Sequence, residues 1–197
     1  MRPLGHNCQY CAYPLPQKEH LVCGLCIKNP PHFDYTYAAY PFEEPLRGLI
    51  HQFKYQKGLY LGSYLSHLML QALPPNFTRP QCLLPVPMHA KRIQQRGFNQ
   101  AAILTKLLAK QLALPYDLRS CKKIINTLPQ ASLDGEQRQK NLRKAFKSIQ
   151  MPYQHIIIID DLLTTGNTAN ELALSLKKSG VQTVGVWCCA RAVYHQG

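Results

Sequence analysis

The stretch from residue 156 to residue 169 reads Ile-Ile-Ile-Ile-Asp-Asp-Leu-Leu-Thr-Thr-Gly-Asn-Thr-Ala. Four consecutive isoleucines make an extended chain apolar on both faces, which is the pattern of a strand buried on both sides of a parallel sheet. We predict this strand at residues 155–159. It delivers two adjacent carboxylates, Asp160 and Asp161, to its carboxyl end, where open α/β sheets bind their ligands.

A turn of small polar residues follows the two carboxylates and leads into a helix predicted at residues 167–179. The turn consists of Thr164, Thr165, Gly166, Asn167 and Thr168. Its backbone N–H groups, its hydroxyls and the positive end of the helix dipole form an anion cradle suited to a phosphomonoester. Because carboxylates repel a bare phosphate, their position beside the cradle favours a sugar phosphate, whose ribose hydroxyls donate hydrogen bonds to Asp160 and Asp161.

Two other interpretations of this stretch remain. An apolar strand that ends in two aspartates is also typical of a Walker B element, but the chain has no GxxxxGK(S/T) loop to accompany it. Alternatively, the aspartates only cap the following helix. That interpretation explains one carboxylate and leaves the run of threonines around Gly166 without a role.

Outward from this stretch, the chain after Phe33 alternates strands and helices. The predicted strands are residues 35–40, 82–86, 121–125, 155–159 and 183–188, and the predicted helices are residues 46–53, 61–73, 99–112, 137–147 and 167–179. Alternation of this kind predicts an α/β fold with a mainly parallel sheet flanked by helices. We assign residues 32–197 to this domain.

Residues 1–31 differ from the rest and end at Asn29-Pro30-Pro31, a sequence typical of a boundary. They contain two Cys-x-x-Cys pairs eleven residues apart, made of Cys8, Cys11, Cys23 and Cys26. Two such turns supply the four thiolates of a structural zinc site. A redox pair normally opens a helix in a βαβ unit, and we expect neither pair to do so. The other cysteines, at positions 82, 121, 188 and 189, fall in predicted strands and are expected in the core.

The chain is strongly basic, with 23 Lys and Arg against 10 Asp and Glu and a net charge of +13. No acidic residue lies between Pro45 and Tyr116, and a second basic cluster comprises Arg138, Lys140, Arg143, Lys144 and Lys147. This asymmetry favours a phosphate-rich partner such as nucleic acid, although charge runs are often only solvated surface. We see no secretory signal and no membrane span, so we expect a cytoplasmic, reducing environment in which the cysteines bind metal or are buried.

The stretch 156–169 resembles the signature of type I phosphoribosyltransferases that binds phosphoribosyl pyrophosphate (PRPP). A second stretch, Leu84-Pro-Val-Pro-Met-His-Ala-Lys-Arg-Ile-Gln-Gln-Arg-Gly-Phe-Asn-Gln100, narrows the match. Together with the four cysteines, the Lys54-Tyr55 pair and Arg138-x-x-Asn141, it resembles the ComF family of bacterial natural transformation and the related GntX-like proteins. The resemblance spans nearly the whole chain and implies a type I phosphoribosyltransferase-like fold with a small N-terminal zinc finger.

The resemblance also implies roles for individual residues. Asp160 and Asp161 would hold the ribose 2′- and 3′-hydroxyls, and the turn 164–168 would hold the 5′-phosphate. Pyrophosphate would lie against His89, Lys91, Arg92 and Arg96, with help from Mg2+. In a catalyst, pyrophosphate would leave C1 of the ribose while Arg96, Lys91 and Mg2+ stabilise its charge. We find no residues that recognise an acceptor base.

These observations leave three functions open. ComF-like proteins are needed for transformation, so the resemblance implies handling of incoming single-stranded DNA. Its bases would stack on Tyr55, Tyr60, Tyr64 or Phe98, although Tyr60 and Tyr64 lie on a helical face that also suits the core. The alternative is an active phosphoribosyltransferase of base salvage or nucleotide metabolism. The third is a module that senses PRPP without consuming it. An uptake helicase and recombination-mediator proteins are partners that the family alone implies.

Overall fold

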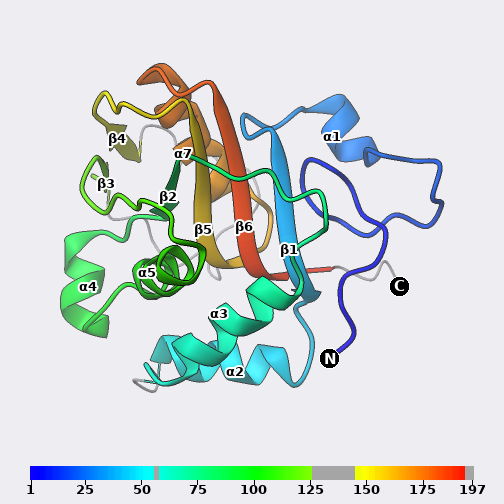
Figure 1. Ribbon diagram of the computed structural model, residues 1–197, viewed down its shortest axis with the longest axis horizontal. Helices are drawn as coiled ribbons and strands as arrows, with labels where there is room; N and C mark the ends of the chain where they lie inside the picture. Colours follow the sequence, from blue (N-terminus) through cyan, green and yellow to red (C-terminus); the bar gives the residue numbers. More distant parts are fainter. Residues whose placement is uncertain (56–57, 126–144, 194–197) are drawn as a thin grey trace.

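The computed structural model of the 197-residue chain describes residues 1–55, 58–125 and 145–193. A parallel sheet lies at its centre (Figure 1). Its strand order is β1 (Tyr35–Pro41), β6 (Thr183–Arg191), β5 (His155–Leu163) and β2 (Cys82–Pro85). Each neighbouring pair is parallel, as the alternation of strands and helices predicted.

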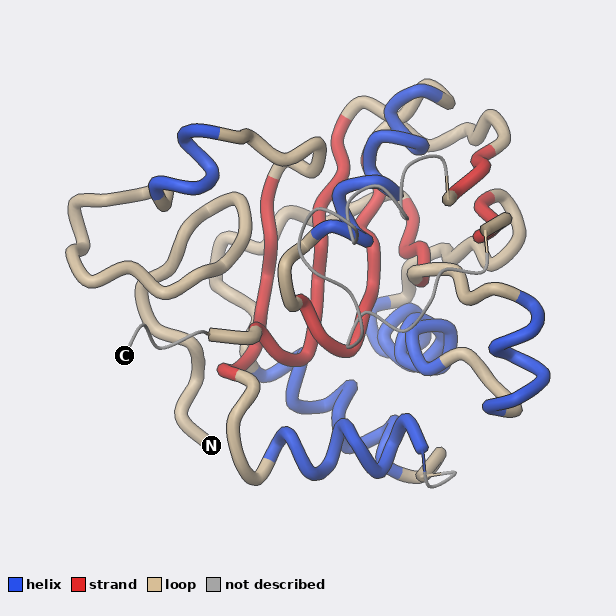
Figure 2. The backbone as a smooth tube through the Cα atoms, turned by 180° about the vertical axis from the view of Figure 1, so that it is seen from behind, coloured by secondary structure: helices blue, strands red, loops and turns tan. Residues whose placement is uncertain are grey.

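Helices cover both faces of the sheet. One face carries α2 (Leu46–Tyr55), α3 (Leu61–Gln71) and α5 (Gln100–Leu112). The opposite face carries α7 (Asn167–Lys178), which Figure 2 shows in front of the strands. An antiparallel pair, β3 (Cys121–Lys123) and β4 (Phe146–Ser148), lies beside α7.

The four isoleucines of β5 build both halves of the core, as the sequence predicted. Ile156 and Ile158 pack with Leu172 of α7, whereas Ile157 and Ile159 pack with Leu104 of α5 on the other face. All four isoleucines are fully buried. Side chains of a strand alternate between its faces, so Asp160 continues the α7 side and Asp161 continues the α5 side.

Two predictions about secondary structure need correction. β5 does not end at residue 159 but continues through both aspartates to Leu163, because β6 pairs with it as far as Arg191. The helix predicted at residues 137–147 is wrong at its carboxyl end, since Phe146 and Lys147 lie in β4. Phe146 is buried against α7 and Lys147 is exposed, so burial there alternates as in a strand. Residues 137–144 lie outside the described residues.

Two short helices were not predicted. α4 (Ala90–Arg96) begins after His89 and ends at Gly97, whose φ of 89° is left-handed and suits glycine. α1 (Gly24–Lys28) has Cys23 as its N-cap. Both are too short to show a clear helical period in the sequence.

The N-terminal segment lies along the edge strand β1. The Thr36 N–H donates to the Gln9 carbonyl at 3.2 Å, and the Leu4 N–H donates to the Ala39 carbonyl at 3.1 Å. An uncovered edge strand offers free backbone groups to other chains, so this segment protects β1 from unwanted pairing. None of the helices in the described part of the chain has the length and apolarity to span a bilayer.

Candidate functional site

A cavity of about 330 Å³ opens at the carboxyl ends of β5 and β2. Its walls come from the last turn of α2, the segment after β2, the first turn of α5, β3, and the turn between β5 and α7. This is the edge of a parallel sheet at which ligands bind. The cavity brings together most of the predicted binding residues, namely Asp160, Asp161, Arg92, Arg96, His89, Thr164, Gly166 and Thr168.

The two aspartates lie in different surroundings because they point to opposite faces of β5. Asp161 is only 5% exposed and forms an ion pair with Lys54 of α2. Asp160 is half-buried, and its Oδ1 accepts a hydrogen bond from the Asp161 N–H at 2.9 Å. Burial raises the pKa of Asp160 well above its usual range, and the charge of Asp161 raises it further, while Lys54 opposes the shift. A hydroxyl donor or a cation at Asp160 would stabilise its charged form.

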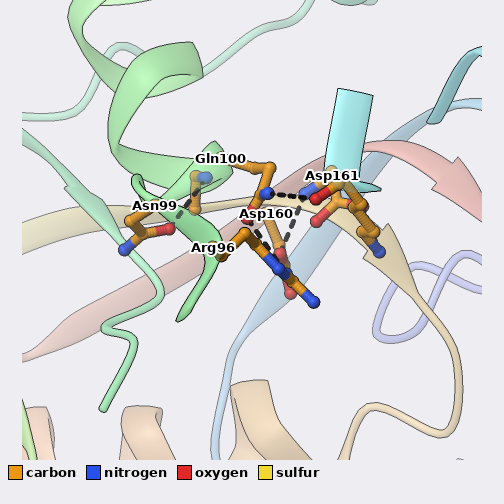
Figure 3. A network of polar contacts seen from close by, with 7 residues as sticks. Arg96, Asn99, Gln100, Asp160 and Asp161 are labelled. Atoms are coloured by element: carbon orange, nitrogen blue, oxygen red, sulfur yellow. Dashed lines mark hydrogen bonds and ion pairs between the residues drawn. The ribbon is translucent and has the colours of Figure 1, made fainter. Parts of the chain in front are cut away.

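Lys54 is held at two points, its side chain by Asp161 and its backbone carbonyl by Gln100. Burial alone would lower the pKa of Lys54, but the carboxylates of Asp161 and Asp160 raise it overall, so the ammonium stays charged. The backbone carbonyl of Lys54 accepts from Gln100 Nε2 at 3.3 Å, and Gln100 Oε1 in turn accepts from Arg96 Nη1 at 3.2 Å. Figure 3 shows this network, which joins the ends of α2, α4 and α5 to β5. The acidic and basic side chains are therefore fixed before any ligand arrives.

Sequence reasoning missed several residues of the cavity. Lys123 of β3 lines it, and burial together with the charge of Arg92 lowers the pKa of Lys123 to about 8, although Asp160 acts in the opposite direction. Gln100 is 2% exposed and polar, at a helical position that sequence reasoning left without a role. Lys54 was noted only as part of the family resemblance. The lack of acidic residues from 45 to 116 was a signal for these basic walls, but it named no single residue.

The turn between β5 and α7 leads into a helix at Asn167, as the sequence predicted. Gly166 is the N-cap of α7 with a φ of 81°, a left-handed value that glycine adopts without strain. Thr164, Gly166 and Thr168 line the cavity, whereas Thr165 and Asn167 do not. Lys91, another predicted ligand, is exposed on α4 and also lies outside the cavity wall.

The four predicted metal ligands lie together. The Sγ atoms of Cys8, Cys11, Cys23 and Cys26 are all within 4.8 Å of one another. The Sγ atoms of Cys11 and Cys23 are 3.7 Å apart, close to the separation of about 3.8 Å that a tetrahedral site with zinc–sulfur bonds of about 2.3 Å requires. The donor set and its spacing therefore fit a structural zinc ion.

The electrostatics of this cluster also favour a cation. Burial raises the pKa of Cys11 and of Cys26, and repulsion between the neighbouring thiolates raises both further. A divalent metal removes that penalty. The second pair does open a short helix, because Cys23 is the N-cap of α1. That helix has five residues and precedes the first strand, so it is not the crossover helix of a redox βαβ unit. The other four cysteines are buried, as expected.

No protein-family model matches the chain. Individual relatives do. The chain is 34% identical over 193 residues to DNA utilization protein YhgH of Shigella flexneri, an alignment that covers 94% of this chain and 84% of the relative. It is 33% identical over 179 residues to Competence protein F of Haemophilus influenzae, an alignment that covers 86% of this chain and 78% of that relative.

The chain belongs to the ComF family. Competence protein ComFC of Bacillus subtilis is a more distant relative, 25% identical over 189 residues that cover 89% of this chain and 73% of the relative. The resemblance drawn from the sequence motifs is thus confirmed. One of those motifs, Arg138-x-x-Asn141, and the basic residues Arg138, Lys140, Arg143 and Lys144 lie outside the described residues, so their place relative to the cavity is not assigned.

Replacing Lys54 with methionine should leave the Asp161 carboxylate buried without its cation. Breaking a buried pair in this way should lower the free energy of unfolding by about 3 kcal/mol, as measured by urea denaturation. The double variant Lys54→Met/Asp161→Asn should recover most of that loss. As a control, Arg47→Met breaks the exposed ion pair with Glu44 and should cost about 0.5 kcal/mol or less. An equal, small cost for both single variants would contradict the structural role of Lys54.

The purified protein should hold one zinc ion per chain, as measured by mass spectrometry of its metal content. Cys26→Ser should lose the ion, because a structural site needs all four thiolates. Cys121→Ser is the matched control, since Cys121 is also buried but lies outside the cluster. Full zinc content in Cys26→Ser would show that the four cysteines are not the ligands.

Proposed function

We propose that this ComF-family chain handles incoming single-stranded DNA in the cytoplasm during natural transformation, and that it binds PRPP with Mg2+ in the cavity at the end of β5. The names of its relatives, a competence protein and a DNA utilization protein, support the first part. The type I phosphoribosyltransferase-like fold of residues 32–197 and the zinc module of residues 1–31 are parts of the same proposal.

One observation carries the PRPP assignment. A single cavity is lined by two carboxylates, by the glycine turn at the start of α7, and by Arg92, Arg96 and Lys123. A bare polyphosphate would be repelled by the carboxylates, and a neutral sugar would leave the cations without partners. A ribose with phosphate groups at both ends satisfies both sets of side chains at once.

Each part of such a ligand has a complementary part of the cavity. The hydroxyls of the ribose would donate to Asp160, whose pKa is raised by burial and by the charge of Asp161, so that such donors would stabilise its charged form. The 5′-phosphate would lie at the N-terminus of α7, where backbone N–H groups and the helix dipole attract anions. Arg92, Arg96 and Lys123 would hold the pyrophosphate. Mg2+ would bind mainly through phosphate oxygens and water, so it needs no dedicated set of protein ligands.

Calorimetry with PRPP and Mg2+ should show binding that Asp160→Asn weakens about 10-fold or more, because the amide oxygen is a weaker acceptor for ribose hydroxyls than a carboxylate. The affinity should also depend on pH through Lys123. Its pKa of about 8 means that the ammonium is charged below that pH and is neutralised as the pH rises through it. Affinity should therefore fall above about pH 8, and Lys123→Met should weaken binding and remove that fall.

Lys106→Met is the control for the lysine variant, because Lys106 is exposed on α5 outside the cavity. Absence of PRPP binding in the unmodified protein, or binding that Asp160→Asn leaves intact, would contradict the assignment. The same samples incubated with a panel of nucleobases separate a binding module from a transferase, since only a transferase releases pyrophosphate.

Three exposed tyrosines, of which Tyr55 lines the cavity, suit single-stranded DNA. Tyr55, Tyr60 and Tyr64 are 63%, 74% and 47% exposed, so the last two are not core residues. The guanidinium of Arg96 lies over the Tyr55 ring at 4.9 Å. Exposed aromatic rings among cations bind single strands by stacking on bases while the cations meet phosphates. Phe98 packs against Phe53 and the core, so it is left out of this surface.

Fluorescence anisotropy with a labelled single-stranded oligonucleotide should give an affinity that falls steeply with salt. The slope of log affinity against log salt should be about −2 or steeper, which corresponds to about three neutralised phosphates. Tyr60→Ala and Tyr64→Ala should each weaken binding about 5-fold or more and leave the slope unchanged, because stacking is not ionic. Tyr116→Ala is the matched control, at 47% exposure on another part of the molecule. Salt-independent binding, or equal effects of all three variants, would refute this surface.

A further inference from the structure

Arg191, the last residue of β6, is a buried cation that neither the metal site nor the cavity uses directly. It is 6% exposed. Within the described residues, its guanidinium donates to backbone carbonyl oxygens and forms no ion pair with a carboxylate. Burying a guanidinium is unfavourable unless its N–H groups are satisfied. The carbonyls that satisfy Arg191 come from segments far apart in the sequence.

One side of the guanidinium holds the start of the turn at residues 164–168, which is the proposed phosphate site and is called the phosphate turn below. Nη1 donates to the carbonyls of Leu163 at 3.2 Å and Thr164 at 2.5 Å, and to that of Ala192 at 2.6 Å. A trans peptide group is planar, with its C=O and N–H in opposite directions. Anchoring the carbonyls of Leu163 and Thr164 therefore fixes the next two N–H groups, those of Thr164 and Thr165, on the side away from Arg191.

The other side of the guanidinium holds the four-cysteine module. Nε donates to the Cys11 carbonyl at 2.7 Å, and the guanidinium lies 5.5 Å from the centre of the Tyr13 ring. Cys11 is itself one of the four clustered thiols. A segment this small, with few apolar contacts of its own, keeps its conformation through its metal. The Cys11 carbonyl is thus offered to Arg191 only while the module is folded.

We propose that Arg191 couples the metal site to the phosphate turn, so that zinc binding holds residues 164–168 in the conformation that accepts a phosphate. Arg191 is a positioning residue, because it acts through the backbone of the turn and touches no ligand. The identity of the phosphate ligand rests on the proposed function, but the coupling itself does not. When zinc leaves, the guanidinium loses its partners on one side, and the turn loses the rigid anchor on which its N–H groups depend.

Amide hydrogen exchange of the full-length protein, with and without zinc, tests this coupling directly. Chelation of zinc should speed exchange about 10-fold or more at the Asn170 and Ala192 N–H groups, which donate to the Gly166 and Leu163 carbonyls of the turn. Residues 157–159 in the centre of β5 should stay protected. Arg191→Met with zinc still bound should show the same fast exchange in the turn, and removing its zinc should add little. Arg191→Lys keeps the charge but has a single nitrogen, so it cannot hold both sides and should also lose the coupling.

Arg79→Met is the matched control, because Arg79 also donates to two carbonyls, those of Leu112 and Ala113, far from the turn. Turn protection in zinc-loaded Arg191→Met equal to that of the unmodified protein would overturn the proposal. The proposal would also be overturned if zinc removal changed the exchange rate of the turn equally in the unmodified protein and in Arg191→Met. If chelation also speeds exchange at residues 157–159, the whole sheet has loosened. The comparison of zinc-loaded Arg191→Met with the zinc-loaded unmodified protein then decides the outcome.

PRPP affinity provides the second measurement. Zinc removal should weaken PRPP binding about 5-fold or more in the unmodified protein, within the range of ordinary coupling between sites, and should have little further effect in Arg191→Met. If zinc removal speeds exchange in the turn but the protein binds no PRPP, the proposed ligand is refuted and the coupling still stands. The two failures are therefore distinguishable.

Discussion

The ion pair between Lys54 and Asp161 is the contact on which the arrangement of the site depends. β5 is buried on both faces, and near its carboxyl end it carries two adjacent carboxylates, whose burial and mutual repulsion raise the pKa of Asp160. Lys54 compensates Asp161 on the α5 side, and its own backbone is held through Gln100 and Arg96. Asp160, on the α7 side, is left with a raised pKa and faces a cavity with basic walls. The raised pKa of this carboxyl, beside basic walls, is what supports the proposal that the cavity binds a ligand.

Patterns that are local in the sequence predicted the centre of the fold well. Four isoleucines, two aspartates and a glycine turn identified β5, its carboxyl edge and α7, and the spacing of four cysteines identified their cluster. What failed depends on partners distant in the sequence. β5 is longer than its apolar run because β6 pairs with it, and Phe146 is in a strand because β3 and α7 lie against it. Lys123 enters the cavity only because β3 folds back beside it, which no spacing in the sequence reveals.

The cavity proposed for PRPP and the surface proposed for DNA meet at Arg96 and Tyr55. Arg96 lines the cavity and lies over the ring of Tyr55, which is itself part of the exposed aromatic surface. At the other end of the cavity, the start of the phosphate turn is joined by Arg191 to the four-cysteine module. A ligand in the cavity therefore contacts segments that lead both to the proposed DNA surface and to the metal site. This arrangement gives a physical reason for one chain to combine the four-cysteine module with the proposed sugar-phosphate cavity and the proposed DNA surface.

The most direct measurement is a crystal structure of the zinc-loaded protein grown with PRPP and Mg2+. The account predicts the ribose hydroxyls within hydrogen-bonding distance of Asp160, the 5′-phosphate at the N-terminus of α7, and Lys54 still paired with Asp161. Density for the ligand at another part of the surface, or an Asp160 side chain turned away from a bound sugar, would contradict it.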